Sequence, residues 1–131
     1  MRLRRGVLSV LVGVEALVGS GCSPYAYYEE AIQYTELARS VLVARGMCQD
    51  KQDCTGKGLV FFEAGQISFG PISWGGVFVN LYGIEDAALV DEVAAKFQEL
   101  HGRLKGPKVR LNVYSSKHSE SKIKFREIVV E

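Results

Sequence analysis

The chain has 131 residues, of which 47% are hydrophobic and 24% are charged, and its formal net charge is +1. This length and composition predict one small globular domain that buries a core of its own. The near-neutral charge argues against nucleic acid as a partner, because phosphate binding needs a concentrated basic face.

The first 22 residues have the pattern of a secretory signal peptide. Three arginines form a positive tip, an apolar run follows from Val7 to Val14, and small residues lead to Cys22. The apolar run is too short to span a membrane, which takes about 20 residues, and Glu15 follows it directly. A transmembrane helix is therefore not expected here.

We expect residues 1–21 to be removed and residues 22–131 to form a single α+β domain. Removal of the leader takes away three arginines and Glu15. The mature part then has 13 basic and 14 acidic residues, so its net charge stays close to zero.

The segment Ser20-Gly21-Cys22 resembles the lipobox of bacterial lipoproteins, in which the cysteine is acylated and becomes the first mature residue. The resemblance covers only the leader, and Gly19 occupies a position where family members usually carry a large aliphatic residue. It implies a palmitate-type lipid anchor on Cys22, and Ser23 implies the outer membrane, facing the periplasm. Gly19 and Gly21 also fit ordinary signal cleavage, so a soluble periplasmic or secreted product is the alternative.

The cysteine count favours the lipid anchor. The chain has three cysteines, Cys22, Cys48 and Cys54. Lipid on Cys22 leaves an even pair, whereas without lipid one thiol would be unpaired in an oxidising compartment. The five residues between Cys48 and Cys54 fit neither a zinc knuckle nor a thioredoxin-like pair, so we expect a local disulfide.

The first predicted helix runs from about Pro24 to Arg45. Ser23 is a suitable cap, and Pro24 suits the first helical position. Apolar residues recur at three- and four-residue spacing, which predicts a core-facing stripe. This stripe consists of Tyr27, Ala31, Tyr34, Ala38, Val41 and Leu42.

Two strands and a loop are predicted next. Leu59–Phe62 has strand length, Ala64-Gly65 favours a turn, and Gln66–Phe69 alternates, so the three together predict a hairpin. Gly70–Gly76 is expected to be a loop that carries the only tryptophan, Trp74. An indole in such a loop either anchors a partner or covers the edge of the core.

The remaining elements have clear periodic patterns of apolar residues. Val77–Tyr82 is the strongest strand, and a helix is expected from Glu85 to Lys105. Strands are predicted at Val109–Tyr114 and Ile123–Val130, where a change of parity near Arg126-Glu127 indicates a bulge. These last two strands are expected to form a terminal hairpin.

The order helix, three strands, helix, two strands predicts an α+β fold. We expect a two-layer sandwich in which both helices pack on one face of a mostly antiparallel sheet of four or five strands. The other face is expected to carry Phe78, Asn80, Tyr82, Arg110, Asn112, Tyr114, Lys124 and Arg126. Such residues are typical of recognition surfaces, but solvent-facing strands also use them for cross-strand pairing.

The sequence contains no catalytic or metal-binding motif, and its two histidines are far apart. No catalytic residue, metal ligand or cofactor is predicted. We expect a non-catalytic envelope lipoprotein of the inhibitor, immunity or accessory type, which binds a protein partner. The predicted partner-binding residues are Trp74, Phe78, Tyr82, Arg110 and Tyr114. The alternative is a carrier of a small ligand or envelope component, held in a pocket between helices and sheet.

Overall fold

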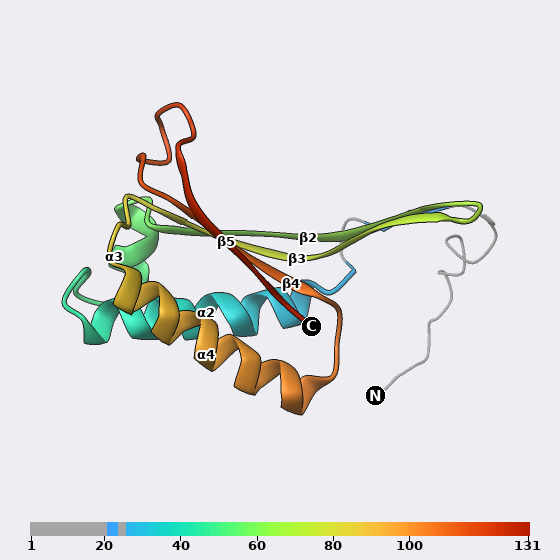
Figure 1. Ribbon diagram of the computed structural model, residues 1–131, viewed down its shortest axis with the longest axis horizontal. Helices are drawn as coiled ribbons and strands as arrows, with labels where there is room; N and C mark the ends of the chain where they lie inside the picture. Colours follow the sequence, from blue (N-terminus) through green and yellow to red (C-terminus); the bar gives the residue numbers. More distant parts are fainter. Residues whose placement is uncertain (1–20, 24–25) are drawn as a thin grey trace.

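The structure is a computed structural model that describes residues 21–23 and 26–131, with backbone only at residues 21–23, 73 and 74. The described residues form one sheet and three helices (Figure 1). Apart from Gly21, the expected signal peptide lies outside the described residues. Pro24 lies outside them too.

The sheet has five strands in the order β1-β2-β3-β4-β5. The strands are β1 (Gly21–Ser23), β2 (Val60–Phe69), β3 (Ile72–Tyr82), β4 (Val109–Tyr114) and β5 (Lys124–Val130), and the helices are α2 (Tyr28–Ala44), α3 (Lys51–Gly56) and α4 (Ala87–Leu104). Strands β3 and β4 are parallel, joined across α4, and the other three pairs are antiparallel. The predicted α+β fold with a mostly antiparallel sheet is confirmed, and the parallel pair makes the sheet mixed.

Helices α2 and α4 cover one face of the sheet (Figure 1). The first helix begins at Tyr28 instead of Pro24, and Ser23 belongs to β1 instead of capping the helix. Helix α4 begins after Asp86, whose side chain accepts hydrogen bonds from the backbone N–H groups of Ala88 and Leu89 at 3.0 and 3.2 Å. That capping supplies partners for two otherwise free helical donors.

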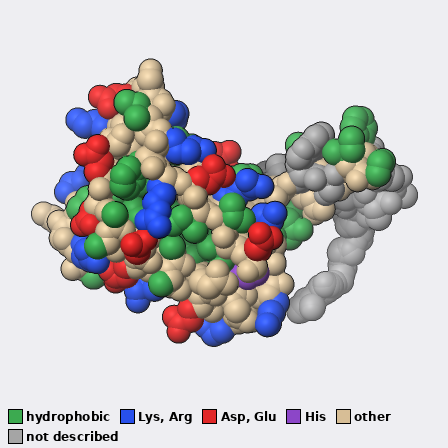
Figure 2. Space-filling view, in the orientation of Figure 1, with side chains coloured by type: hydrophobic (Ala, Val, Ile, Leu, Met, Phe, Trp, Pro, Cys, Tyr) green, Lys and Arg blue, Asp and Glu red, His purple; other side chains and the backbone are tan. Residues whose placement is uncertain are grey.

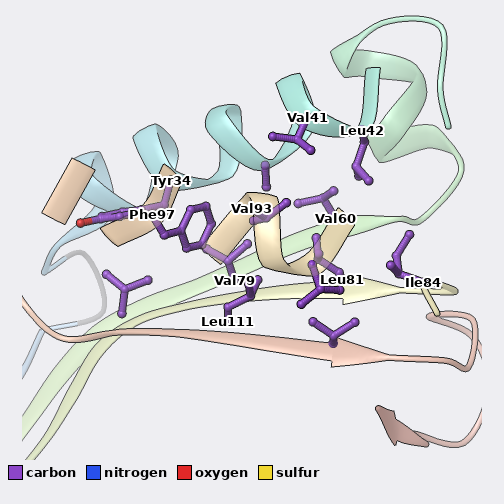
Figure 3. Packing of buried hydrophobic residues seen from close by; sticks show 14 of the residues in the cluster. Tyr34, Val41, Leu42, Val60, Val79, Leu81, Ile84, Val93, Phe97 and Leu111 are labelled. Atoms are coloured by element: carbon purple, nitrogen blue, oxygen red, sulfur yellow. The ribbon is translucent and has the colours of Figure 1, made fainter. Parts of the chain in front are cut away.

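The core fills the space between the helices and the sheet (Figure 3). The Tyr34 ring of α2 meets the Phe97 ring of α4 edge to face, with centroids 5.1 Å apart. The predicted stripe of the first helix is buried as expected, with Tyr27 partly buried at its end. Strand β3 contributes Val77, Val79 and Leu81, all fully buried.

The cysteine-flanked segment after α2 folds into the short helix α3. The expected disulfide between Cys48 and Cys54 is present, both residues are buried, and their Cα atoms are 5.2 Å apart. The Asp50 carboxylate accepts a hydrogen bond from the backbone N–H of Asp53 at 2.8 Å and so caps α3. The disulfide therefore closes a short helical turn at the end of α2.

The predicted turn at Ala64-Gly65 and the predicted loop at Gly70–Gly76 are both wrong. Strand β2 continues through Gly65, and β3 already begins at Ile72. The two strands form one long hairpin that turns at Gly70-Pro71. Glycine is compatible with a turn and also with a close strand contact, and here Gly65 pairs with Gly76 within the ladder.

Two glycines in β3 adopt backbone angles that other residues rarely adopt. Gly75 and Gly76 have φ values of 143° and 126°. A Cβ at Gly75 would overlap the Gly65 carbonyl oxygen, and a Cβ at Gly76 would lie 2.8 Å from the Lys108 carbonyl oxygen. Both obstacles are backbone atoms that cannot swing away. These positions therefore require glycine.

The expected bulge in the last strand lies slightly earlier than predicted. Val113 pairs with Arg126 and Tyr114 pairs with Lys124, so Phe125 is the extra residue. The bulge reverses the face to which the following side chains belong. As a result, Arg126 lies on the helix side, where its guanidinium contacts the Asp91 carboxylate of α4 at 2.6 Å.

We predict that Gly76→Ala lowers the free energy of unfolding by about 2 kcal/mol, because it combines backbone strain with a steric overlap. The matched control is Gly102→Ala in α4, where a Cβ meets nothing within 4 Å. This control should be neutral or should stabilise the helix by up to about 1 kcal/mol. Chemical denaturation measures both changes, and a Gly76→Ala protein as stable as the parent would contradict this account of the strand.

Candidate partner-binding face

The face of the sheet opposite the helices is here called the open face. Its side chains form three rows across the strands, set by the register of β2, β3, β4 and β5. The first row is Glu63, Phe78, Arg110 and Val129, the second is Phe61, Asn80, Asn112 and Glu127, and the third contains Tyr82, Tyr114 and Lys124. Polar and apolar groups alternate within the first row, whereas the second places two asparagines side by side and the third two tyrosines.

A hydrogen-bonded chain of side chains crosses the middle of the open face. The Asn112 amide donates to the Asn80 carbonyl oxygen at 3.0 Å, and the Asn80 amide donates to the Glu63 carboxylate at 3.1 Å. Asn80 and Asn112 are buried, at 4% and 9% exposure. The Asn112 side-chain oxygen is buried without a hydrogen-bond partner. This chain fixes the orientation of two amides in the centre of the face.

Four rings gather at the end of β3, and we call Phe61, Tyr82, Tyr114 and His118 the aromatic cluster. Tyr82 and Tyr114 are stacked with centroids 5.0 Å apart, and His118 stacks on Phe61 at 4.1 Å. His118 also meets Tyr82 edge on at 4.9 Å. Because His118 comes from the loop between β4 and β5, that loop covers one end of the open face.

The surroundings of the Tyr82 side chain favour its neutral form. Desolvation raises the pKa of the Tyr82 phenol above its usual value, and the neighbouring Tyr114 and Glu63 add to this effect. The Lys122 ammonium lies 4.6 Å from the centre of the Tyr82 ring, within the range of a cation–π contact. Tyr82 is therefore a neutral, packed centre of the aromatic cluster.

Charged groups on the open face pair with one another. The Arg110 guanidinium lies 5.9 Å from the Phe78 ring centre and 3.4 Å from the Glu127 carboxylate. Lys124 contacts Glu127 at 3.0 Å. Hydrogen bonding and charge from Lys124, with a smaller contribution from Arg110, hold the pKa of Glu127 below its usual value.

The structure brings together four of the five residues predicted for partner binding. Phe78 and Arg110 lie in the first row of the open face and Tyr82 and Tyr114 in the third, on either side of the asparagine pair. Trp74 is also in β3, opposite Ile67, but it lies eight residues before Tyr82, or about 26 Å along the strand. The predicted surface therefore divides into two separate regions.

Several residues of the open face were missing from the sequence-based site. Glu63, Phe61 and Glu127 belong to its first two rows, and His118 and Lys122 reach Tyr82 from the loop that follows β4. The alternation of Phe61 and Glu63 with buried Val60 is a signal that could have identified the two β2 residues. The histidine contact depends on the fold of the loop and has no local sequence signal.

The described side chains give little indication of a metal or ligand site. Among residues 26–131, no three His, Cys, Asp or Glu side chains could together hold a metal ion. A surface pocket of about 440 Å³ lies between α2 and α3, lined by Glu36, Arg39, Lys51, Gln52, Thr55 and Gly56. Within the described part of the chain, no helix is long and apolar enough to cross a membrane.

Comparison of the chain with protein-family models, curated proteins and solved structures gave no match in any of the three.

We predict that Asn80 and Asn112 are energetically coupled. Asn80→Val should lower the free energy of unfolding by about 2 kcal/mol, because it leaves the Asn112 amide buried without its acceptor. The double change Asn80→Val/Asn112→Val should cost less than the sum of the two single changes, by about 1 kcal/mol. Denaturation of the four proteins measures the coupling, and strict additivity would show that the amide pair is unimportant.

Proposed function

We propose that the mature chain is a small non-catalytic envelope lipoprotein that binds a protein partner through the open face. The observation that carries the proposal is the combination of an aromatic cluster with the Phe78–Arg110 pair on a sheet face that none of the described helices covers (Figure 1). Tyrosine, phenylalanine and arginine are enriched where protein interfaces bury surface. The proposed location is the outer membrane, with Cys22 as the lipid-bearing residue and the domain in the periplasm.

The exposure of the open face supports recognition by contact. Phe78, Arg110 and Tyr114 are partly buried, so each keeps surface available to a partner while its position is fixed by neighbours. At the free edge of the face, Val129 is 40% exposed. Side chains held in place in this way lose less entropy on binding than freely moving ones.

The internal pairing of the charges supports a non-catalytic role. Glu63 accepts from Asn80, and Glu127 is shared by Arg110 and Lys124. A general acid or base needs a titratable group directed at a reacting atom. On the open face, the carboxylates are instead engaged in fixing the surface.

The carrier interpretation requires space between the helices and the sheet. That space is occupied by core side chains, including Tyr34, Phe97 and Leu42, all of which are less than 2% exposed (Figure 3). The pocket between α2 and α3 is rimmed by the ion pairs of Glu36 with Arg39 and Lys51. We therefore favour a protein partner over an apolar cargo.

The test is cross-linking in the native host, followed by purification of the tagged protein from detergent-solubilised envelope. We expect the Arg110→Ala/Tyr114→Ala protein to recover at least about tenfold less of the cross-linked partner, as for the loss of interface hot spots. Both residues are partly exposed, so the variant should still fold. Tyr82→Ala is less suitable, because Tyr82 is only 5% exposed.

The matched control is Arg103→Ala/Tyr28→Ala, which removes the same residue types from exposed positions on α4 and α2. This control should recover the partner at the parental level. Equal recovery by both variants, or equal loss, would contradict the assignment of partner binding to the open face. Denaturation curves for both variants exclude unfolding as the cause.

A further inference from the structure

The hairpin of β2 and β3 is longer than the body of the domain. Strand β4 pairs with β3 only from Val77 onward, and residues 66–75 project past the helices (Figure 1). We call this segment the projecting hairpin. It begins at the glycine pair Gly65–Gly76, where the two strands leave the packed core.

The projecting hairpin carries exposed apolar side chains on one of its faces. Ile67 pairs with Trp74, and Phe69 pairs with Ile72. Directly opposed residues of an antiparallel pair share a face, so Ile67, Phe69 and Ile72 lie on the same side. They are 46%, 65% and 49% exposed, and Figure 2 shows hydrophobic side chains at the end of the hairpin.

The same segment has no charge. The sequence contains no Asp, Glu, Lys or Arg from Ala64 to Ile84, although 24% of the chain is charged. Exposed strands in soluble proteins usually carry charges that discourage unwanted association. A charge-free, apolar end with a tryptophan is instead typical of segments at a lipid–water interface.

The position of β1 indicates which partner covers this surface. Cys22 pairs with Ile67, and Ile67 pairs with Trp74, so the three residues occupy one row across β1, β2 and β3. Acyl chains attached at Cys22 would therefore extend from the domain next to the exposed side chains of Ile67, Phe69 and Ile72. The Tyr27 hydroxyl donates to Gln66 at 3.3 Å, which joins the start of α2 to the same end of the molecule.

We infer that the projecting hairpin contacts the bilayer surface beside the lipid on Cys22, with the side chains of Ile67, Phe69 and Ile72 at the interface. This inference rests on the proposed anchor at Cys22. The contact is interfacial, because the outer backbone edge of residues 72–76 is not paired with β4 and full burial in hydrocarbon would leave polar groups without partners. The membrane and the aromatic cluster then lie at opposite ends of β3.

The test uses Trp74, the only tryptophan, as an internal probe. The protein, purified in detergent from its host, is reconstituted into phosphatidylethanolamine–phosphatidylglycerol vesicles whose acyl chains are brominated near the headgroup. We expect the brominated lipids to quench Trp74 emission and aqueous iodide to quench it weakly. In Phe69→Ser/Ile72→Ser, the ratio of lipid to iodide quenching should fall at least about tenfold, because two apolar groups are lost from the interface.

The matched control is Phe125→Ser/Ile123→Ser, which removes the same residue types from positions that are 40% and 61% exposed at the other end of the sheet. This control should keep the parental ratio. Parental protein that floats with the vesicles but whose Trp74 is quenched by iodide and not by lipid overturns the contact. Cross-linking of the hairpins of two copies in place of lipid quenching would also overturn it.

The experiments distinguish a wrong assignment of the hairpin contact from a wrong assignment of the lipid anchor. Cys22 without lipid, detected by mass, removes the anchor alone. Addition of that unlipidated chain to the same vesicles then decides the hairpin contact: lipid quenching of Trp74 supports it, and its absence overturns it. A lipidated, floating chain with iodide-accessible Trp74 overturns only the hairpin contact.

Discussion

The strict alternation of side chains along β3 and β4 determines the rest of the structure. Val77, Val79 and Leu81 are fully buried against the helices, which commits Phe78, Asn80 and Tyr82 to the opposite face. A register slip of one residue would place an asparagine pair in the apolar core, so the pairing is strongly specified. The open face is therefore a direct consequence of core formation.

Strand β3 also extends beyond the core that fixes it. Its eleven residues span about 33 Å, at about 3.3 Å per residue step, from Ile72 in the projecting hairpin to Tyr82 in the aromatic cluster. In the proposed arrangement, one end of this strand lies at the membrane and the other presents the recognition surface. The hairpin then acts as a spacer, and the glycines at positions 65, 75 and 76 mark where the spacer leaves the body.

The elements with a regular period could be predicted from the sequence. The helical stripe containing Tyr34 and the alternating strand Val109–Tyr114 were predicted correctly, because their packing follows from local spacing. The hairpin was not, because a glycine such as Gly75 indicates a turn as readily as a close contact with another strand. Its requirement for glycine comes from the Gly65 carbonyl, ten residues away in the sequence.

Most residues of the open face were predicted from the sequence, but the position of Arg126 and the contact of His118 with Phe61 were not. Arg126 was assigned to the wrong face, because the bulge at Phe125 comes earlier than the change of parity suggested. His118 and Phe61 are brought together only when the loop after β4 folds over the sheet. Contacts between segments distant in sequence depend on the whole topology and leave no pattern in either segment.

The proposed attachment to the membrane depends on the covalent state of Cys22, which intact mass spectrometry of protein from the native host's envelope measures directly. We expect a chain that begins at Cys22, carries acyl groups on that residue and has no free thiol, since Cys48 and Cys54 are joined. A chain that retains Met1, or one that begins at Cys22 with an unmodified thiol, would contradict the proposed attachment to the membrane.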